Sequence, residues 1–184
     1  MKQIFNSKYL KDSIHETIRD LTSFGSPIVL VIIIFLFFGF TLESLLLLAG
    51  FVVIEVICSL LKYFLYKDRP IKKDHQNILE KVDAGSFPSI HSARNSYIFT
   101  TIFFLSPYSF VKILAIIIPF MVCSTRVLLK KHYLIDVVAG YLIGVLFAWI
   151  WTFVFKAFLW SGQRLKIISS CLSLFGFGFL FLSF

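Results

Sequence analysis

Residues 42–65 read LESLLLLAGFVVIEVICSLLKYFL, and this stretch decides the fold class. Its only charged side chains are Glu43, Glu55 and Lys62. A helix needs roughly 20 apolar residues to cross the ~30 Å hydrocarbon core of a bilayer. Membrane β-strands would instead alternate apolar and polar residues, and this stretch does not. It therefore predicts a transmembrane α-helix.

Further apolar runs lie on both sides of this stretch. They cover residues 26–40, 95–106, 108–129, 133–157 and 166–184. The runs at 26–40 and 95–106 are short for a span, so we expect their helices to extend into the neighbouring polar sequence. The sequence predicts an all-α, polytopic transmembrane bundle of about six spans.

The composition excludes several classes of protein. Hydrophobic residues make up 58% of the 184 residues and charged residues 15%, and Phe alone occurs 23 times. A soluble domain of this size could not bury so much apolar surface. The net charge of +8 is explained by Lys and Arg at the membrane interface, so we expect no nucleic-acid binding. Three cysteines, Cys58, Cys123 and Cys171, lie in separate apolar runs without the spacing of a metal site.

The amino-terminal segment differs from the rest. In residues 1–24, the apolar residues Leu10, Ile14, Ile18, Leu21 and Phe24 share one helical face. This pattern predicts an amphipathic helix on the membrane surface, or equally a solvated helix packed on the remaining chain. We therefore divide the chain into an interfacial helix, 1–24, and a transmembrane domain, 25–184.

The distribution of Lys and Arg predicts the orientation. Six spans put both termini, the polar loop 66–94 and the connection 126–132 on one side. Without the three cations discussed below, that side carries eleven Lys and Arg and the other carries four. The positive-inside rule then favours a cytoplasmic location for these segments in the cell membrane.

Charged residues within or beside the spans are candidates for function. Glu55, Lys62 and Arg69 are seven residues apart, so they share a helix face if the helix continues to Pro70. Taken alone, the two cations could simply reach the interface, and Glu55 could be a buried partner of Lys62.

Two further clusters lie at helix ends on the same side. One is Pro88-Ser89-Ile90-His91; the other is Thr125-Arg126 followed by His132 and Asp136. Three cations suit a multiply charged oxyanion. The carboxylate of Asp136 can accept one ring N–H of His132 and leave the other nitrogen free as a nucleophile.

These three motifs resemble those of the type 2 phosphatidic acid phosphatase (PAP2) superfamily. They are Lys62-x6-Arg69-Pro70, Pro88-Ser89-Ile90-His91 and Thr125-Arg126-x5-His132-x3-Asp136. The family usually has Gly where Ile90 stands and Ser where Thr125 stands. Both changes affect the shape of the pocket, but they remove no group that attacks phosphorus or moves a proton.

The resemblance implies a lipid phosphatase that works through a phosphohistidine without a metal or cofactor. His132 would attack phosphorus, Asp136 would orient it, and His91 would protonate the leaving oxygen and later accept a proton from water. The phosphate oxygens would be held by Lys62, Arg69, Ser89, Ile90 and Arg126. The implied substrates are polyprenyl diphosphate, phosphatidylglycerol phosphate or phosphatidic acid, reached from the surrounding membrane lipids.

Two alternative functions are compatible with these residues. A phosphotransferase would pass the phosphate to a lipid or sugar hydroxyl instead of water. A non-enzymatic membrane protein could have kept the fold, although the intact motifs argue against this. Asp83, Ser86 and Arg94 flank the second motif and are expected to order its loop without a catalytic role.

Overall fold

In the computed structural model, residues 14, 16–18, 20–71 and 76–181 are described. They contain helices and connecting segments, with no strand in this part of the chain. The chain divides into two compact units, Met1–Trp149 and Ile150–Phe184. The all-α class is confirmed. The predicted interfacial helix 1–24 stays a prediction, because residues 1–13, 15 and 19 lie outside the described residues.

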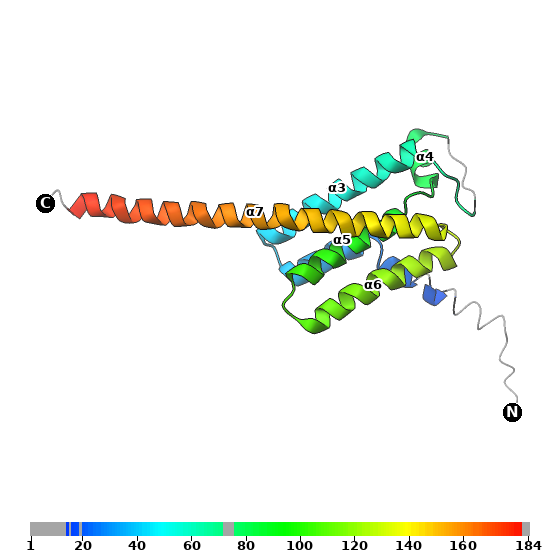
Figure 1. Cartoon of the computed structure of the whole chain (residues 1–184), viewed down its shortest axis with the longest axis horizontal. Helices are drawn as coiled ribbons and strands as arrows, with labels where there is room; N and C mark the ends of the chain where they lie inside the picture. Colours follow the sequence, from blue (N-terminus) through cyan, green and yellow to red (C-terminus); the bar gives the residue numbers. More distant parts are fainter. Residues whose placement is uncertain (1–13, 15, 19, 72–75, 182–184) are drawn as a thin grey trace, which may run out of the picture. The chain divides into compact units, whose positions relative to one another are not determined.

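The described residues contain the helical segment Glu16–Ser23 and, after it, the helices α2 to α7 (Figure 1). These helices are α2 (Pro27–Phe38), α3 (Leu42–Phe64), α4 (Ile78–Ala84), α5 (Ile90–Leu105), α6 (Ser109–Leu128) and α7 (Leu134–Phe181). Helix α7 includes most of the expected run at 133–157 and residues 166–181 of the run at 166–184, whose last three residues lie outside the described part of the chain. The run at 95–106 extends towards the amino terminus as expected, because α5 begins at Ile90.

Local sequence signals explain where α2 and α3 begin and end. Ser26 caps α2 by accepting a hydrogen bond from the backbone of Val29, and a proline stands at the first helical position. Gly39 ends α2 with φ of 62°, a conformation that favours glycine. Thr41 and Ser44 then form a reciprocal capping box at the start of α3.

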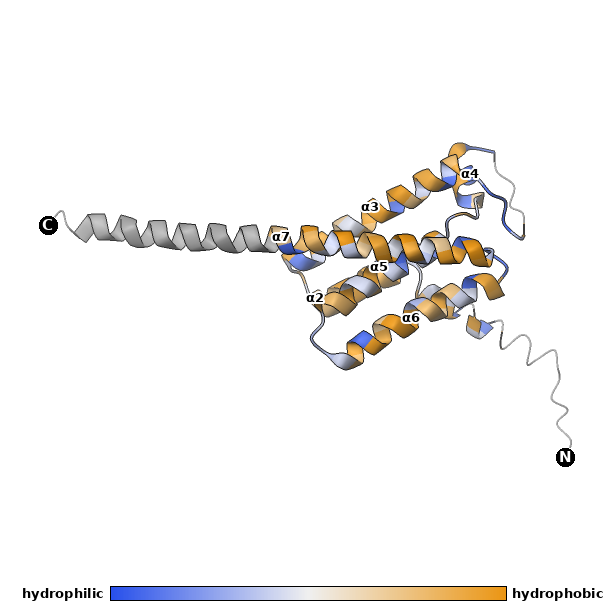
Figure 2. Cartoon of the chain, in the orientation of Figure 1, coloured by the Kyte–Doolittle hydropathy of each residue, from blue (hydrophilic) through white to orange (hydrophobic). Residues whose placement is uncertain are grey.

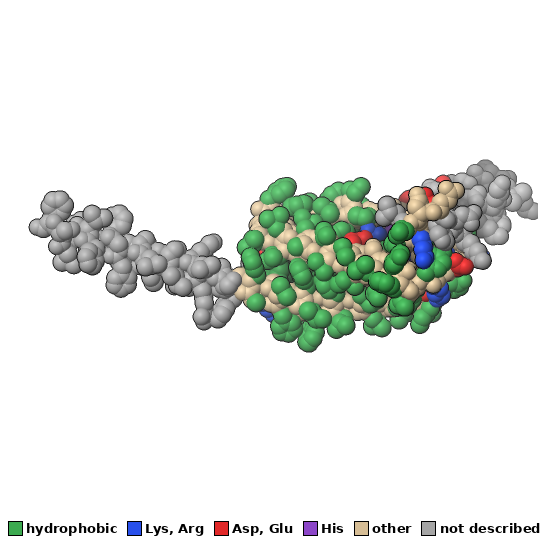
Figure 3. Space-filling model, turned by 90° about the horizontal axis from the view of Figure 1, so that it is seen from above, with side chains coloured by type: hydrophobic (Ala, Val, Ile, Leu, Met, Phe, Trp, Pro, Cys, Tyr) green, Lys and Arg blue, Asp and Glu red, His purple; other side chains and the backbone are tan. Residues whose placement is uncertain are grey.

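Three helices are long and apolar enough to cross a membrane. They are Leu42–Phe64, Ser109–Leu128 and Leu134–Phe158, and the bent pair Glu16–Ser23 and Pro27–Phe38 would make a fourth. These candidate spans are those of the described residues, so the count of six spans stays a prediction. Hydrophobic residues prevail along α3 and α6 (Figure 2), and hydrophobic side chains cover much of the face shown in Figure 3. Exposed apolar residues of this kind, such as Val52 and Phe120, suit contact with lipid.

Helix α5 is the centre of the first unit. Every residue from Ser92 to Phe99 is buried, and the helix packs against α2, α3 and α6. Two glycines allow α7 to approach it closely: a Cβ atom on Gly140 would collide with the carbonyl of Ser89, and one on Gly144 with Ser96. This packing brings the start of α7 beside the start of α5.

One expectation about α3 is wrong. The helix ends at Phe64 and does not continue to Pro70. Arg69 therefore lies in the non-helical segment after α3 and does not share a helix face with Glu55 and Lys62. Because this segment is not helical, it can fold back over the carboxyl end of α4.

Candidate active site

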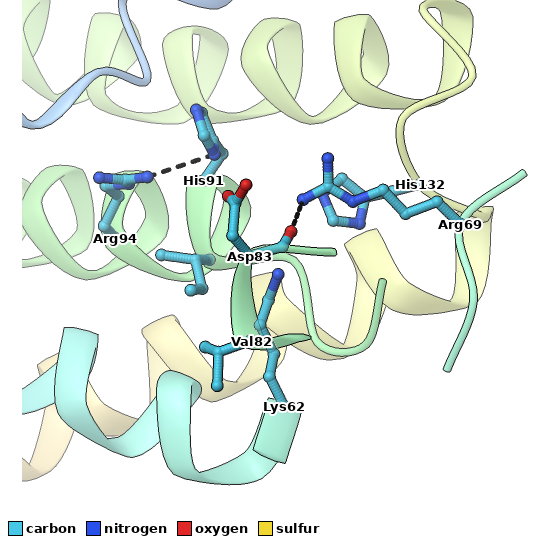
Figure 4. A pocket seen from close by; sticks show the side chains of 8 residues that line it. Lys62, Arg69, Val82, Asp83, His91, Arg94 and His132 are labelled. Atoms are coloured by element: carbon cyan, nitrogen blue, oxygen red, sulfur yellow. Dashed lines mark hydrogen bonds between the residues drawn. The ribbon is translucent and has the colours of Figure 1, made fainter. Parts of the chain in front are cut away.

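Two cations converge on the end of the short helix α4. The Nζ atom of Lys62 donates to the carbonyl of Gly85 at 2.7 Å. Arg69 reaches the same carbonyl through Nε at 3.5 Å and also donates to the carbonyl of Asp83 (Figure 4). Carbonyls at a helix carboxyl end carry partial negative charge and suit cations. Helix α4 therefore holds both side chains, although they come from different segments.

The second motif forms the start of α5. Ser89 stands at the N-cap position, its backbone N–H donates to the carbonyl of Asp136 at 2.9 Å, and its hydroxyl accepts from Ser92 at 3.0 Å. Its side chain is buried and does not line the cavity described below, whereas Ile90 and His91 do. The expected contact of the Ser89 hydroxyl with phosphate stays a prediction.

His91 has a cationic partner on its own helix. Arg94 lies three residues further along α5, and its Nη2 atom is 3.2 Å from Nδ1 of His91. The other guanidinium branch is 3.2 Å from Glu55 on α3. Glu55 is therefore the partner of Arg94, which corrects the sequence-based pairing of Glu55 with Lys62. Asn95 adds a hydrogen bond to the carbonyl of His91 at 2.9 Å.

A tight turn after α6 presents His132. Lys130 adopts φ of 53°, which non-glycine residues rarely do, and the chain turns back on itself. The backbone N–H groups of Lys131 and His132 then donate to the carbonyl of Arg126, at 3.1 and 3.3 Å. The third motif is thus a single folded unit, in which the position of the histidine depends on the end of the helix that carries Arg126.

The ring of His132 is oriented by a backbone carbonyl. Its Nδ1 atom lies 2.7 Å from the carbonyl oxygen of Ser86. A carbonyl can only accept, so Nδ1 carries the proton and Nε2 keeps its lone pair. Burial, followed by the nearby charge of Arg126, lowers the pKa of His132 to about 3. The imidazole is therefore neutral at physiological pH, as a nucleophile requires.

Asp136 does not contact the ring of His132, which corrects the expected pairing. Its carboxylate accepts from the Ser86 hydroxyl at 2.5 Å, from the backbone N–H of Tyr133 at 3.1 Å and from Nζ of Lys67 at 2.7 Å. The reason is that His132 precedes α7, which begins at Leu134, so the two residues are not one helical turn apart. Asp136 instead closes the first turn of its own helix, as a capping-box acid does.

These side chains surround a cavity of about 190 Å³ (Figure 4). Its lining residues are Lys62, Arg69, Val82, Asp83, Ile90, His91, Arg94 and His132. The two histidines thus face one space together with three cations. An anion with several negative charges suits such a lining.

A second cavity, of about 370 Å³, adjoins the first. The two share Arg69, Asp83 and His91, and the second adds Arg126 and Lys131. Arg126 is buried, and among the described residues its Nε atom has no hydrogen-bond partner. Thr22, Ser23 and Ser26, from the segment before α2, complete the lining. Of the three predicted cations, Arg126 therefore serves this second space.

Three residues outside the motifs contact motif side chains, which the sequence did not predict. Ser86, Arg94 and Lys67 contact His132, His91 and Asp136 respectively. The signal for Arg94 was a second charged residue one helical turn after a motif histidine, opposite Glu55. No sequence signal links Lys67 to Asp136, because they are 69 residues apart. The described part of the chain contains no group of three His, Cys, Asp or Glu side chains placed to hold a metal ion.

The chain is similar to known proteins in sequence and in structure. The sequence model of the PAP2 superfamily matches residues 43–160. A phosphatidylglycerolphosphate phosphatase of the PAP2 type from Bacillus subtilis is similar in structure, with a TM-score of 0.64, 25% identity, and coverage of 78% of this chain and 77% of that one. Aquifex aeolicus LpxE has a TM-score of 0.62 at 22% identity, covering 76% and 85% of the two chains. A search of curated proteins found no match.

Proposed function

Because the chain belongs to the PAP2 superfamily, we propose that it is a membrane phosphatase acting on a phosphate ester or diphosphate of a lipid. The observation that carries this proposal is the cavity in which His91 and His132 face Lys62 and Arg69. A nucleophile, a second imidazole and fixed cations around one cavity are what phosphoryl transfer needs.

His132 is the proposed nucleophile. Its Nε2 lone pair would attack phosphorus and form a phosphohistidine, while Nδ1–H stays bonded to the carbonyl of Ser86. That bond stabilises the positive charge that develops on the ring. Water then attacks the phosphohistidine and regenerates the neutral imidazole.

The cations hold the phosphate oxygens. Lys62 and Arg69 are anchored by carbonyls at the end of α4, so they need little reorganisation when substrate binds. Preorganised charge of this kind is usually the largest single contribution to stabilising a transition state. The backbone N–H group of Ile90, at the start of α5, is a further candidate, because Ile90 lines the cavity, and His91 faces the leaving oxygen.

We also propose that the reaction needs no metal ion. The fixed charges of Lys62, Arg69 and Arg126 can neutralise a phosphate that other phosphatases neutralise with divalent cations. Asp136, the only carboxylate of the three motifs, is engaged by Lys67 and Ser86.

The candidate substrates are phosphatidylglycerol phosphate, phosphatidic acid and polyprenyl diphosphate. The first is suggested by the Bacillus subtilis relative, whose structure is similar over 78% of this chain. A lipid substrate also fits a site at the end of apolar, membrane-crossing helices.

The deciding experiment measures phosphate release by the purified full-length protein from a panel of these lipids, in detergent with excess EDTA. We expect release from at least one lipid. Lys62→Met and Arg69→Met should reduce it strongly, whereas Lys112→Met, a cation at the opposite end of the helices, should not. Activity that requires added Mg²⁺ would contradict the metal-free site, and the absence of release from every lipid would contradict the function.

We propose further that the site faces the cytoplasm, as the distribution of Lys and Arg predicts. The exposed residue Asn77, at the start of α4, provides a test. Asn77→Cys, in a protein whose three natural cysteines are replaced, should not react in intact cells with a thiol reagent that cannot cross the membrane. Labelling without permeabilisation would place the site outside.

A further inference from the structure

We infer that Arg94 and Glu55 restrict His91 to donating a hydrogen bond, so that the site favours lipid diphosphates over lipid monophosphates. This inference rests on the proposed phosphatase function and names its substrate class. It follows from the contact between Arg94 and His91, from the way Arg94 is held in place, and from the second cationic cavity beside the first.

The contact determines the tautomer of His91. A guanidinium has only N–H donors and no acceptor. The 3.2 Å contact between Nη2 of Arg94 and Nδ1 of His91 therefore requires a lone pair on Nδ1. A neutral imidazole with a lone pair on Nδ1 carries its proton on Nε2. His91 can then present Nε2–H to a substrate oxygen.

Arg94 is fixed in this position. Its side chain is buried, with 6% exposure, and Glu55 on α3 holds its other branch at 3.2 Å. Asn95 fixes the backbone of His91 from the same helix. The Arg94 guanidinium cannot easily turn away from Glu55, because doing so would leave a buried positive charge without its counter-ion.

A second proton on His91 is disfavoured by this arrangement. It would have to sit on Nδ1, facing the N–H groups of Arg94. The other ionisable groups around the ring are Lys62 on α3, Arg69 on the segment after it, Asp83 on α4, Arg126 on α6, and Lys131 and His132 on the following connection. All of them except the carboxylate of Asp83 are cationic or neutral, so they do not favour an imidazolium.

A His91 ring without a second proton limits which leaving groups the site can expel. The bond from phosphorus to the leaving oxygen breaks as the bond from His132 Nε2 to phosphorus forms, and the electron pair stays on the leaving oxygen. An alkoxide is a strong base and needs a proton at that moment, whereas a phosphate leaving from a diphosphate does not. For a phosphate that leaves from a diphosphate, the hydrogen bond donated by Nε2–H of His91 is sufficient. In the hydrolysis step, a proton of the attacking water goes to the departing phosphate.

The second cavity provides room for the second phosphate. It adjoins the first at His91, where the leaving oxygen would lie, and it contributes Arg126 and Lys131. The guanidinium of Arg126 lines this cavity and adds a positive charge beside the space for the second phosphate. Thr22 lies in the same lining and also bonds to Thr125 at 2.8 Å, which ties the segment before α2 to the third motif.

The test compares two lipids that differ only in the leaving group, dioleoylglycerol pyrophosphate and dioleoyl phosphatidic acid. For the purified full-length enzyme we expect kcat/KM to be at least ~100-fold higher for the pyrophosphate, the lower end of what general-acid catalysis contributes. If neither these two lipids nor any other lipid of the panel described above releases phosphate, the proposed function fails. If both are hydrolysed without this preference, only the present inference fails.

Variants separate a positioning role of Arg94 from a structural one. Arg94→Met combined with Glu55→Gln removes both charges, so that no buried charge is left alone. It should reduce the preference at least ~10-fold and add a limb to the pH profile near the ordinary histidine pKa, ~6.5. Arg94→Lys, which keeps a donor, should retain the preference. Equal losses on both lipids with an unchanged pH profile would overturn the inference.

Discussion

The first turn of α5 and the connection between α6 and α7 each present one histidine to the same cavity, but they hold the two rings in opposite ways. His132 faces an acceptor, the carbonyl of Ser86, through Nδ1. His91 faces a donor, the guanidinium of Arg94, through the same atom. Nε2 is therefore a lone pair on His132 and an N–H group on His91.

This difference shows that the partner of Nδ1 assigns the role of each ring. The same side chain becomes a candidate nucleophile beside a backbone carbonyl and a hydrogen-bond donor beside an arginine. Neither partner belongs to the three motifs. The residues around the motifs thus determine what the motif histidines can do.

The largest effect is expected at His132. His132→Ala should abolish phosphate release, because no other described side chain offers a free nucleophilic nitrogen to this cavity. Turnover with labelled substrate, stopped in alkaline denaturant because phosphohistidine is hydrolysed by acid, should trap phosphate on the wild-type protein and not on this variant. His75→Ala, in the polar loop outside the described residues, is the matched control and should retain activity. Undiminished turnover by His132→Ala would refute the covalent mechanism.

A smaller effect is expected at His91. His91→Ala removes the N–H that faces the leaving oxygen and should slow turnover ~10²- to 10³-fold. His91→Gln keeps an N–H donor on a side chain of similar length and should recover part of that loss. If the alanine and glutamine variants lose the same activity, His91 does not act through a donated hydrogen bond.

The third prediction concerns Asp136. Since its carboxylate bonds to Lys67, Ser86 and Tyr133 and not to the ring of His132, Asp136→Asn should reduce kcat only ~10-fold. Removing a carboxylate that acts directly on a catalytic histidine costs ~10⁴-fold in a serine protease. A loss of that size, with the thermal stability unchanged, would show that Asp136 moves to His132 during turnover.

Much of this arrangement could be predicted from the sequence. The apolar stretch 42–65 predicts a spanning helix, and α3 occupies almost the same residues, Leu42–Phe64. All three motifs were expected to converge: Lys62, Arg69, Ile90, His91 and His132 line one cavity, whereas Ser89, Arg126 and Asp136 do not line it. Both successes depend on local information: hydropathy determines the helix, and the placement of the motifs at helix ends determines the side of the bundle.

The remaining features depend on contacts that periodicity does not show. The pairing of His132 with Asp136 was inferred from helical spacing, but α7 begins two residues after His132 and the spacing rule does not apply. The carbonyl of Ser86 and the ammonium of Lys67 come from the loop between α3 and α5, and only the folded chain brings them to the third motif. A loop without a regular period gives no register from which to predict such contacts.

The smallest expected effect is a change of stability with pH, which distinguishes a buried neutral His132 from a solvated one. Burial and Arg126 lower the pKa of His132 to about 3 in the folded protein, against ~6.5 for an unfolded chain. Between these values the unfolded state binds a proton that the folded state does not, so this residue makes the folded protein less stable as the pH falls. This destabilisation is absent above pH ~7 and reaches about 2 kcal/mol at pH ~5.

His132→Gln cannot bind the proton, so its thermal unfolding in detergent should change less between these two pH values than that of the wild type. The same pH dependence in both proteins would mean that water reaches His132 in the folded state, and the contrast with His91 would then depend on hydrogen bonds alone.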